Sequence, residues 1–287
     1  MSSRIEILNA GGYRSDGRTQ YELRSMTIIL GDSAKSLSEN LDDSFSNLYP
    51  NAADGSAIVM HGLTEVSVRV FGPREAQIRR EAIHDRAKIN VQVVMLPFSG
   101  GTANRRRGRG DKRLLELAAA IESTFESVIQ TGLYPRSQID IVVEIHQQDG
   151  GVLHTAINGV TLALTDAGVA MYDQVVAVSA GLHSTAVLLD LSHYEENDMP
   201  FLTVAVMPRS KKVTLLNMES RLHVTRFEHV FKVGCEAAEI IRTEMGNAIM
   251  ARTHALASSA MTGELGQTQR GGGNLIDESG MAYEMEE

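Results

Sequence analysis

Basic side chains interrupted by glycines fill residues 104–113, where the sequence reads Asn-Arg-Arg-Arg-Gly-Arg-Gly-Asp-Lys-Arg. Lys and Arg neutralise phosphates without reading bases, and glycines let a chain drape along a phosphate backbone. The segment therefore predicts contact with a polyanion of any sequence. The alternative is a solvated charged face that pairs with acidic neighbouring subunits. The candidate contacts are Arg105, Arg106, Arg107, Lys112 and Arg113.

The charge of the chain is uneven. Between Arg74 and Arg113, eleven Lys or Arg residues stand against four acids, although the whole chain has 27 bases, 36 acids and a net charge of −9. An acidic body with one basic segment attracts a polyanion at that segment and repels it elsewhere. Base stacking should contribute little to the contact, since the chain has no Trp and only 5% aromatic residues.

A second group of residues that could take part in a reaction is the acidic stretch from Tyr194 to Asp198, which contains Glu195, Glu196 and Asp198. Carboxyl groups can shuttle a proton or position a metal beside a reacting phosphate. Three acids in so short a stretch are equally typical of a solvated turn.

A third candidate is the turn Asp149-Gly150-Gly151, because glycines can open a helix whose first N–H groups attract an anion. The residues that follow, Val152 and Leu153, offer neither a hydroxyl nor a charge. His154 is the one titratable side chain next to them, and a half-charged imidazole is a poor anion ligand.

The pattern of apolar residues predicts the elements that carry these groups. Helical spacing predicts a helix from Asp111 to about Gly132, and a second apolar helix follows at 152–167. A long third helix should begin at residues 225–228, whose Thr and Glu suggest a capping box, and end near Leu256. Alternating or β-branched runs predict strands at 25–30, 57–60, 65–71, 88–96, 138–145, 174–180, 186–189, 201–206 and 212–217, with a hairpin turn at 61–64.

Composition narrows the class of protein. The chain has 43% hydrophobic and 22% charged residues, as soluble domains do, and no run approaches the ~18 apolar residues of a membrane span. A single cysteine, Cys235, excludes an internal disulfide and a cysteine-rich zinc site, so we expect a reducing compartment. We find no apolar segment of a secretory signal near the N-terminus. Polar composition predicts an exposed insertion at about 32–53 and a disordered acidic tail at 257–287.

Seven short strings, taken together and in order, resemble the RNase PH family over about Ile5 to Leu256. The resemblance is to the exosome ring subunits whose archaeal counterparts are phosphorolytic, in a eukaryotic, fungal-like version. The strings are Arg14-Ser15-Asp16-Gly17-Arg18, Ala53-Asp54-Gly55-Ser56, Phe71-Gly72-Pro73-Arg74-Glu75, Pro135-Arg136-Ser137 with Ile139-Asp140-Ile141, Asp149-Gly150-Gly151, Asp166-Ala167-Gly168 and Asp198-Met199-Pro200.

The resemblance implies an α/β (α+β) fold of the ribosomal protein S5 domain 2-like type over residues 1–256, with mixed sheets and packed helices. It also implies a ring of RNase PH-like subunits around a channel for single-stranded RNA, with S1/KH-type cap subunits and an associated hydrolytic exonuclease. The location would be the cytoplasm and the nucleus, including the nucleolus. By the same resemblance, Lys112 and Arg113, together with Arg79 and Arg80, would line the channel.

The resemblance further implies that this chain has lost the phosphorolytic activity of its active relatives. Active relatives continue the glycine turn with Thr or Ser and then Arg, which hold the phosphate, whereas this chain has Val152 and Leu153 there. Active relatives also place two Asp residues six apart at the end of a strand. Asp198 matches the second, and the first aligns near Glu196, so both would be vestigial.

We therefore expect a non-catalytic, RNA-threading scaffold subunit with no cofactor and no metal site. The first alternative is an active phosphate-dependent 3′-to-5′ exoribonuclease that uses Asp198. The second is a small-molecule enzyme on a related fold.

Overall fold

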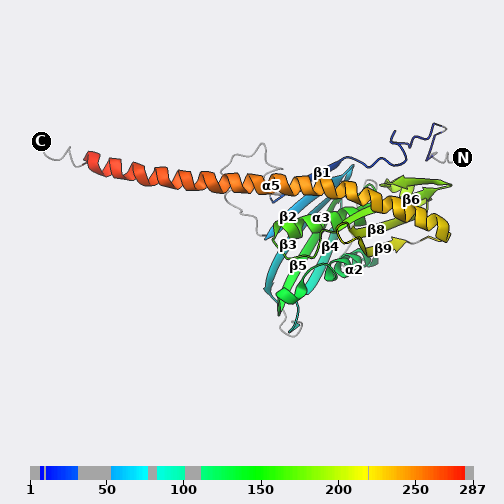
Figure 1. Cartoon of the computed structure of the whole chain (residues 1–287), viewed down its shortest axis with the longest axis horizontal. Coiled ribbons are helices and arrows are strands. Elements are labelled where there is room, and N and C mark those ends of the chain that lie inside the picture. Colours follow the sequence, from blue (N-terminus) through cyan, green and yellow to red (C-terminus); the bar gives the residue numbers. More distant parts are fainter. Residues whose placement is uncertain are drawn as a thin grey trace.

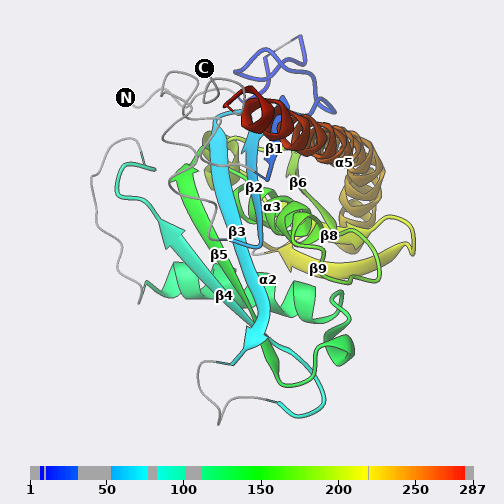
Figure 2. The same cartoon turned by 90° about the vertical axis from the view of Figure 1, so that its left-hand side faces the viewer.

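A computed structural model describes residues 7–9, 11–31, 53–76, 83–100, 111–218 and 220–281, with side chains through residue 258. The described chain forms two β-sheets with helices packed between and around them (Figures 1 and 2). This arrangement has the mixed α/β character expected from the order of strand and helix patterns.

The first sheet has five strands in the order β1-β2-β3-β5-β4. Neighbouring strands are antiparallel except for β4 and β5, which are parallel and joined through the helix α2, as parallel strands require a crossover. Strands β2 and β3 form the expected hairpin, in which His61 pairs with Thr64 and Gly62 has a φ of 58°. The bounds are β1 Met26–Leu30, β2 Gly55–His61, β3 Thr64–Glu75, β4 Lys88–Met95, α2 Lys112–Glu126 and β5 Ser137–Gln147, with a 3-10 turn at Thr131–Leu133.

The second sheet has four antiparallel strands in the order β7-β6-β8-β9. A short helix that the sequence patterns did not predict, α4 (His193–Asp198), connects β7 to β8. The strand bounds are β6 Val176–His183, β7 Ala186–Leu189, β8 Phe201–Met207 and β9 Lys212–Met218.

Helix α3 (Val152–Asp166) lies in the core between the two sheets, where it contacts β2, β3 and β6 (Figure 2). It is buried on nearly all sides, and most of its buried side chains are apolar, as in other core helices. Gly159 allows the close approach, because a Cβ atom there would lie 2.9 Å from Cγ2 of Val68. The N-terminal end of this buried helix is therefore held rigidly relative to both sheets.

Helix α5 (Val224–Met281) runs across the body, packs on β6 and β8, and continues beyond the body (Figure 1). Two sequence expectations about it were wrong. The helix does not end near Leu256, because its backbone continues to Met281. Thr225 is inside the first turn and cannot cap it; the ring of His223 contacts the Thr225 hydroxyl at 2.9 Å instead.

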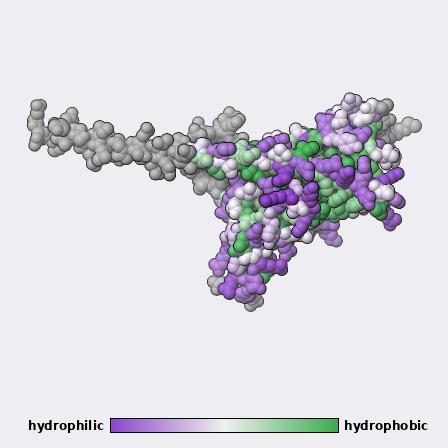
Figure 3. Space-filling model, in the orientation of Figure 1, coloured by the Kyte–Doolittle hydropathy of each residue, from purple (hydrophilic) through white to green (hydrophobic). Residues whose placement is uncertain are grey.

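The other predicted elements are present with shifts of a few residues at their ends. The expected insertion at 32–53 lies almost wholly outside the described residues. On the face drawn in Figure 3, hydrophilic side chains predominate, and apolar ones lie between them in smaller groups. In the part of the chain that the structure describes, no helix combines the length and the apolar character that a membrane crossing needs.

Several of the strings that suggested the family have structural roles away from any site. The Asp54 carboxylate accepts a hydrogen bond of 2.7 Å from the N–H of Gly72. Arg74 forms an ion pair with Asp140 on the neighbouring strand β5. These contacts fix the far end of the first sheet.

Candidate functional site

The turn Asp149-Gly150-Gly151 leads into the N-terminus of α3. Gly150 and Gly151 have φ values of 83° and 67°, a region that glycine adopts without strain. The hydroxyl of Thr64 donates to the carbonyl of Gly150 at 2.7 Å and accepts from the N–H of Asp149 at 3.1 Å. A Cβ atom on Gly150 would lie 2.6 Å from the carbonyl oxygen of Leu191, so the turn sits directly against the segment that follows β7.

The side chain of Glu196, a residue of α4, binds the N-terminus of α3. Its Oε1 atom accepts a hydrogen bond of 2.6 Å from the N–H of Gly151, the residue that caps the helix. A carboxylate in this position replaces an external anion, because the first N–H groups of a helix attract negative charge. Burial raises the pKa of Glu196 to about 7, against the Gly151 hydrogen bond and the charge of Arg24, which both lower it.

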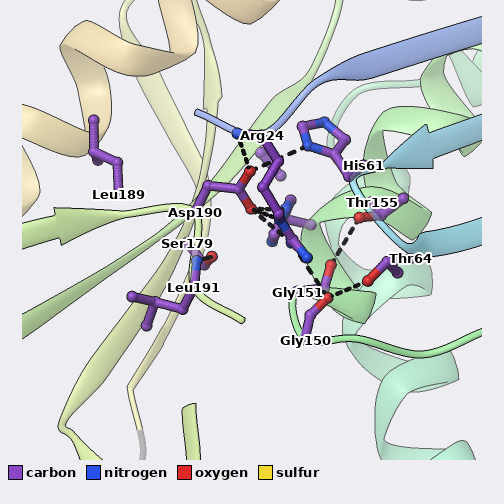
Figure 4. Close-up of polar contacts among 12 residues, drawn as sticks. Arg24, His61, Thr64, Gly150, Gly151, Thr155, Ser179, Leu189, Asp190 and Leu191 are labelled. Atoms are coloured by element: carbon purple, nitrogen blue, oxygen red, sulfur yellow. Dashed lines mark hydrogen bonds and ion pairs between the residues drawn. The ribbon is translucent and has the colours of Figure 1, made fainter. Parts of the chain in front are cut away.

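Asp190 and Arg24 form a buried ion pair next to this turn (Figure 4). Nε and an Nη atom of Arg24 donate to Oδ1 of Asp190 at 3.0 and 2.7 Å, and the Arg24 backbone N–H donates to Oδ2 at 2.8 Å. The guanidinium also donates to the carbonyls of Asp149 and Gly150 at 2.8 and 3.4 Å. One side chain thus links the N-terminal segment, the glycine turn and the end of β7.

Two buried histidines face the same carboxylate. Nδ1 of His61 lies 3.6 Å from Oδ2 of Asp190, and Nε2 of His154 lies 3.5 Å from Oδ1. Burial alone would raise the pKa of Asp190, but the two imidazoles and Arg24 hold that pKa well below its usual value. Burial also lowers the pKa of His154 to about 4, more than Asp190 raises it, so His154 is neutral at pH 7.

The N-terminal string Arg14–Arg18 supports the site through two arginines that bind the backbone of Asp190. The guanidinium groups of Arg14 and Arg18 each donate to the backbone carbonyl of Asp190 at 3.1 Å. Arg14 is almost fully buried and lies 3.7 Å from the Glu195 carboxylate. These contacts fix the backbone of Asp190, which has a φ of 51°.

The acidic stretch differs from the sequence expectation. Glu195 is only 2% exposed and Glu196 is half-buried, so the stretch is solvated only in part. Asp198, which we expected to match the second family carboxylate, is exposed, and the described contacts do not bring it to the glycine turn. Asp190 and Glu196 are also spaced six residues apart, and Asp190 directly follows strand β7. The match of Asp198 to the family carboxylate stays a prediction.

Sequence reasoning missed Asp190, Arg24 and His61. The spacing of six between Asp190 and Glu196 was a readable signal for the first. Nothing in the local sequence marks the other two, because Arg24 precedes a strand and His61 reads as part of a hairpin turn.

The structure places the residues of the expected phosphate position at the start of α3. Val152 is half-buried and Leu153 is 9% exposed, so aliphatic groups cover the first turn. His154 is 1% exposed and turns toward Asp190, where it is not a ligand for an anion at the helix end.

Lys112 and Arg113 are exposed in the first turn of α2, where the Asp111 side chain accepts from the N–H of Arg113 at 3.3 Å. Positive charge at a helix N-terminus opposes the helix dipole, so these two residues do not stabilise the helix. The remaining basic candidates lie outside the described residues: Arg79, Arg80, Arg105, Arg106 and Arg107.

The fold is shared with two solved structures. The rice (Oryza sativa) Rrp46 crystal structure matches with a TM-score of 0.69 and 21% identity, covering 83% of this chain and 100% of that one. A subunit of the Archaeoglobus fulgidus exosome with RNA bound to the active site matches with a TM-score of 0.64 and 21% identity, covering 82% and 93%.

Sequence comparison shows the family. Residues 22–170 match domain 1 of the 3′ exoribonuclease family (RNase PH), and residues 173–237 match domain 2. The chain belongs to this family. It is 37% identical to the human exosome complex component RRP41 over 262 residues, which cover 91% of this chain and 99% of the relative. It is 34% identical to exosome complex component SKI6 of Saccharomyces cerevisiae over 253 residues, which cover 88% and 96%.

Proposed function

We propose that this chain is a ring subunit of an RNA exosome that binds and threads single-stranded RNA and does not itself cleave it. The similarity to RRP41 and SKI6 over most of both chains supports exosome membership. The partners would be other RNase PH-like subunits, S1/KH-type cap subunits and an associated hydrolytic exonuclease, in the cytoplasm and nucleus, including the nucleolus.

The observation that carries the loss of activity is the hydrogen bond from Gly151 to Glu196. Phosphorolysis needs an inorganic phosphate held in line with the last phosphodiester by fixed donors and positive charge. At the N-terminus of α3 the donor is already bound to a carboxylate of this chain. Val152 and Leu153 add no polar group, and a second anion there would meet the charges of Glu196 and Asp190.

The RNA contact is proposed for the exposed pair Lys112 and Arg113, together with Arg79, Arg80, Arg105, Arg106 and Arg107. Each phosphate that these groups neutralise releases counterions, which gives affinity without sequence preference. A channel that must pass any RNA requires this kind of binding.

The test of catalysis uses the reconstituted ring with end-labelled single-stranded RNA and inorganic phosphate. We expect no nucleoside diphosphates. Their release by the wild type and its loss in Glu196→Gln would overturn the proposal, with Asp198→Asn, an exposed acid nearby, as the matched control.

The test of RNA contact reverses two charges in the double variant Lys112→Glu and Arg113→Glu. RNA affinity should fall, and the slope of log affinity against log salt should shrink by roughly 0.7 per lost phosphate contact. The control is the double variant Lys211→Glu and Lys212→Glu, which makes the same charge change at exposed positions on the second sheet. Equal loss in both variants would remove Lys112 and Arg113 from the RNA path.

One observation favours the alternative, an active phosphorolytic exoribonuclease. A carboxyl group with a pKa of about 7, such as Glu196, is well matched to proton transfer at neutral pH, and Asp190 lies six residues before it. The phosphate assay above separates the two functions.

A further inference from the structure

His61, His154 and Asp190 bring three metal-ligating side chains together at a point that the proposed RNA function does not use. His61 ends strand β2, His154 lies in the first turn of α3, and Asp190 directly follows strand β7. Each is 1% exposed, and one ligand atom from each lies within 4.8 Å of the other two. Among the described residues, no other cluster of this kind is present.

Three of the four ring nitrogens of His61 and His154 lack hydrogen-bond partners among the described residues. Both ring nitrogens of His61 and Nδ1 of His154 are buried without one among the described residues. The approaches of 3.6 and 3.5 Å to Asp190 are longer than hydrogen bonds. Buried polar atoms are nearly always paired in folded proteins, so several unpaired nitrogens around one carboxylate indicate a missing partner.

The geometry fits a zinc ion. Tetrahedral zinc with bonds of about 2.0–2.2 Å places its ligand atoms roughly 3.3 Å apart. Nδ1 of His61 lies 3.6 Å from Oδ2 of Asp190, and Nε2 of His154 lies 3.5 Å from Oδ1 of the same carboxylate, so each histidine is within a few tenths of this value from one carboxylate oxygen. The imidazole planes lie at 89° to each other, and small ring rotations would complete the approach of the histidines.

The surroundings hold the ligands in place. Arg24 orients the Asp190 carboxylate. Among the described residues, Oδ2 accepts a hydrogen bond only from the Arg24 backbone N–H, so it retains a lone pair for a metal. The His154 ring packs on Gly151, where a Cβ atom would lie 2.0 Å from the ring. The charges of Asp149 and Glu196 offset the repulsion between a cation and Arg24.

We propose that His61, His154 and Asp190 bind one divalent transition-metal ion, zinc in the first instance, as a structural link between the two family domains. His61 and His154 belong to the first domain, and Asp190 to the second. The inference is independent of whether the ring cleaves RNA, and it replaces the expectation of no metal site.

The first experiment uses the full chain, stripped with a chelator and titrated with zinc sulfate. Calorimetry should give one site per chain, and at zinc concentrations about 100 times the Kd the Tm should rise by roughly 5–10 °C. Cobalt(II) should give the intense visible absorption of a four-coordinate site. His61→Gln and His154→Gln should each weaken binding by about 100-fold or more. His183→Gln and His223→Gln, which change histidines outside the cluster, should leave binding unchanged.

The second experiment does not depend on the variants folding. A crystal of the wild-type chain grown with zinc should show an anomalous peak at the zinc edge between the three side chains. A peak only elsewhere, no peak at saturating zinc, or affinity unchanged in both cluster variants would overturn the proposal.

Discussion

Replacing Glu196 by Gln should change how the stability of the protein depends on pH. Gln is isosteric, and its amide oxygen can still accept the Gly151 hydrogen bond, so the variant removes the ionisation and keeps the contact. The pKa of Glu196 is raised from an ordinary value of 4.5 to about 7 in the folded protein. The folded state therefore holds the proton more tightly than the unfolded state does.

The sign and size of the effect follow by linkage. The stabilisation from the protonated Glu196 is complete below pH 4.5 and is lost as the pH rises through 7. At about 1.36 kcal/mol per pH unit, the shift corresponds to at most about 3 kcal/mol, and the partial exposure of the side chain reduces this value. The advantage of Glu196→Gln over wild type should thus grow by about 1–3 kcal/mol between pH 5 and pH 8.

Urea denaturation of both proteins at half-unit pH steps measures this difference in the free energy of unfolding. The contributions of the other titrating groups are the same in both proteins and cancel in the difference. Asp198→Asn, at an exposed position two residues away, should give a difference that is flat with pH. A flat difference for Glu196→Gln as well would refute the assignment of a half-buried carboxyl group with a raised pKa to the N-terminus of α3.

Two further changes test the rigidity of the site. Arg24→Met should lower the free energy of unfolding by about 3–5 kcal/mol, because it leaves the buried charge of Asp190 unpaired, whereas Arg86→Met, which breaks an exposed pair, should cost less than about 1 kcal/mol. Equal urea midpoints would contradict the difference in burial. Gly150→Ala should cost more than about 1 kcal/mol, since its φ of 83° and the Leu191 carbonyl both oppose a side chain, and a Tm within 1–2 °C of wild type would show that the turn can relax.

Local periodicity was enough to predict most of the fold. The strands β2 and β7 and the helix α3 were predicted nearly to their ends, because their apolar patterns and flanking glycines are local signals. The short helix α4 was missed, since six polar residues carry no periodicity. The extent of α5 was missed because glycine and acid composition suggested a tail where the structure continues the helix.

The candidate site was harder to predict than the fold. The glycine turn and its aliphatic neighbours Val152 and Leu153 were readable, since they are contiguous. Asp190 could not be predicted, because its low pKa and fixed orientation come from its surroundings. Its ion-pair partner Arg24 is 166 residues away in the sequence. A residue whose properties come from partners so distant has no signature of its own in the chain.

That separation also has a consequence for how the protein is made. Arg14, Arg18 and Arg24 leave the ribosome early, whereas Asp190, which all three contact, is synthesised only after the whole first domain. Until then, the guanidinium groups of these arginines remain in water. The loop that closes when they contact Asp190 is long, which slows folding. The contacts of these arginines with Asp190 can therefore form only after synthesis of the second domain has begun. An N-terminal fusion that keeps residues 14–24 away from Asp190 should reduce the yield of folded protein.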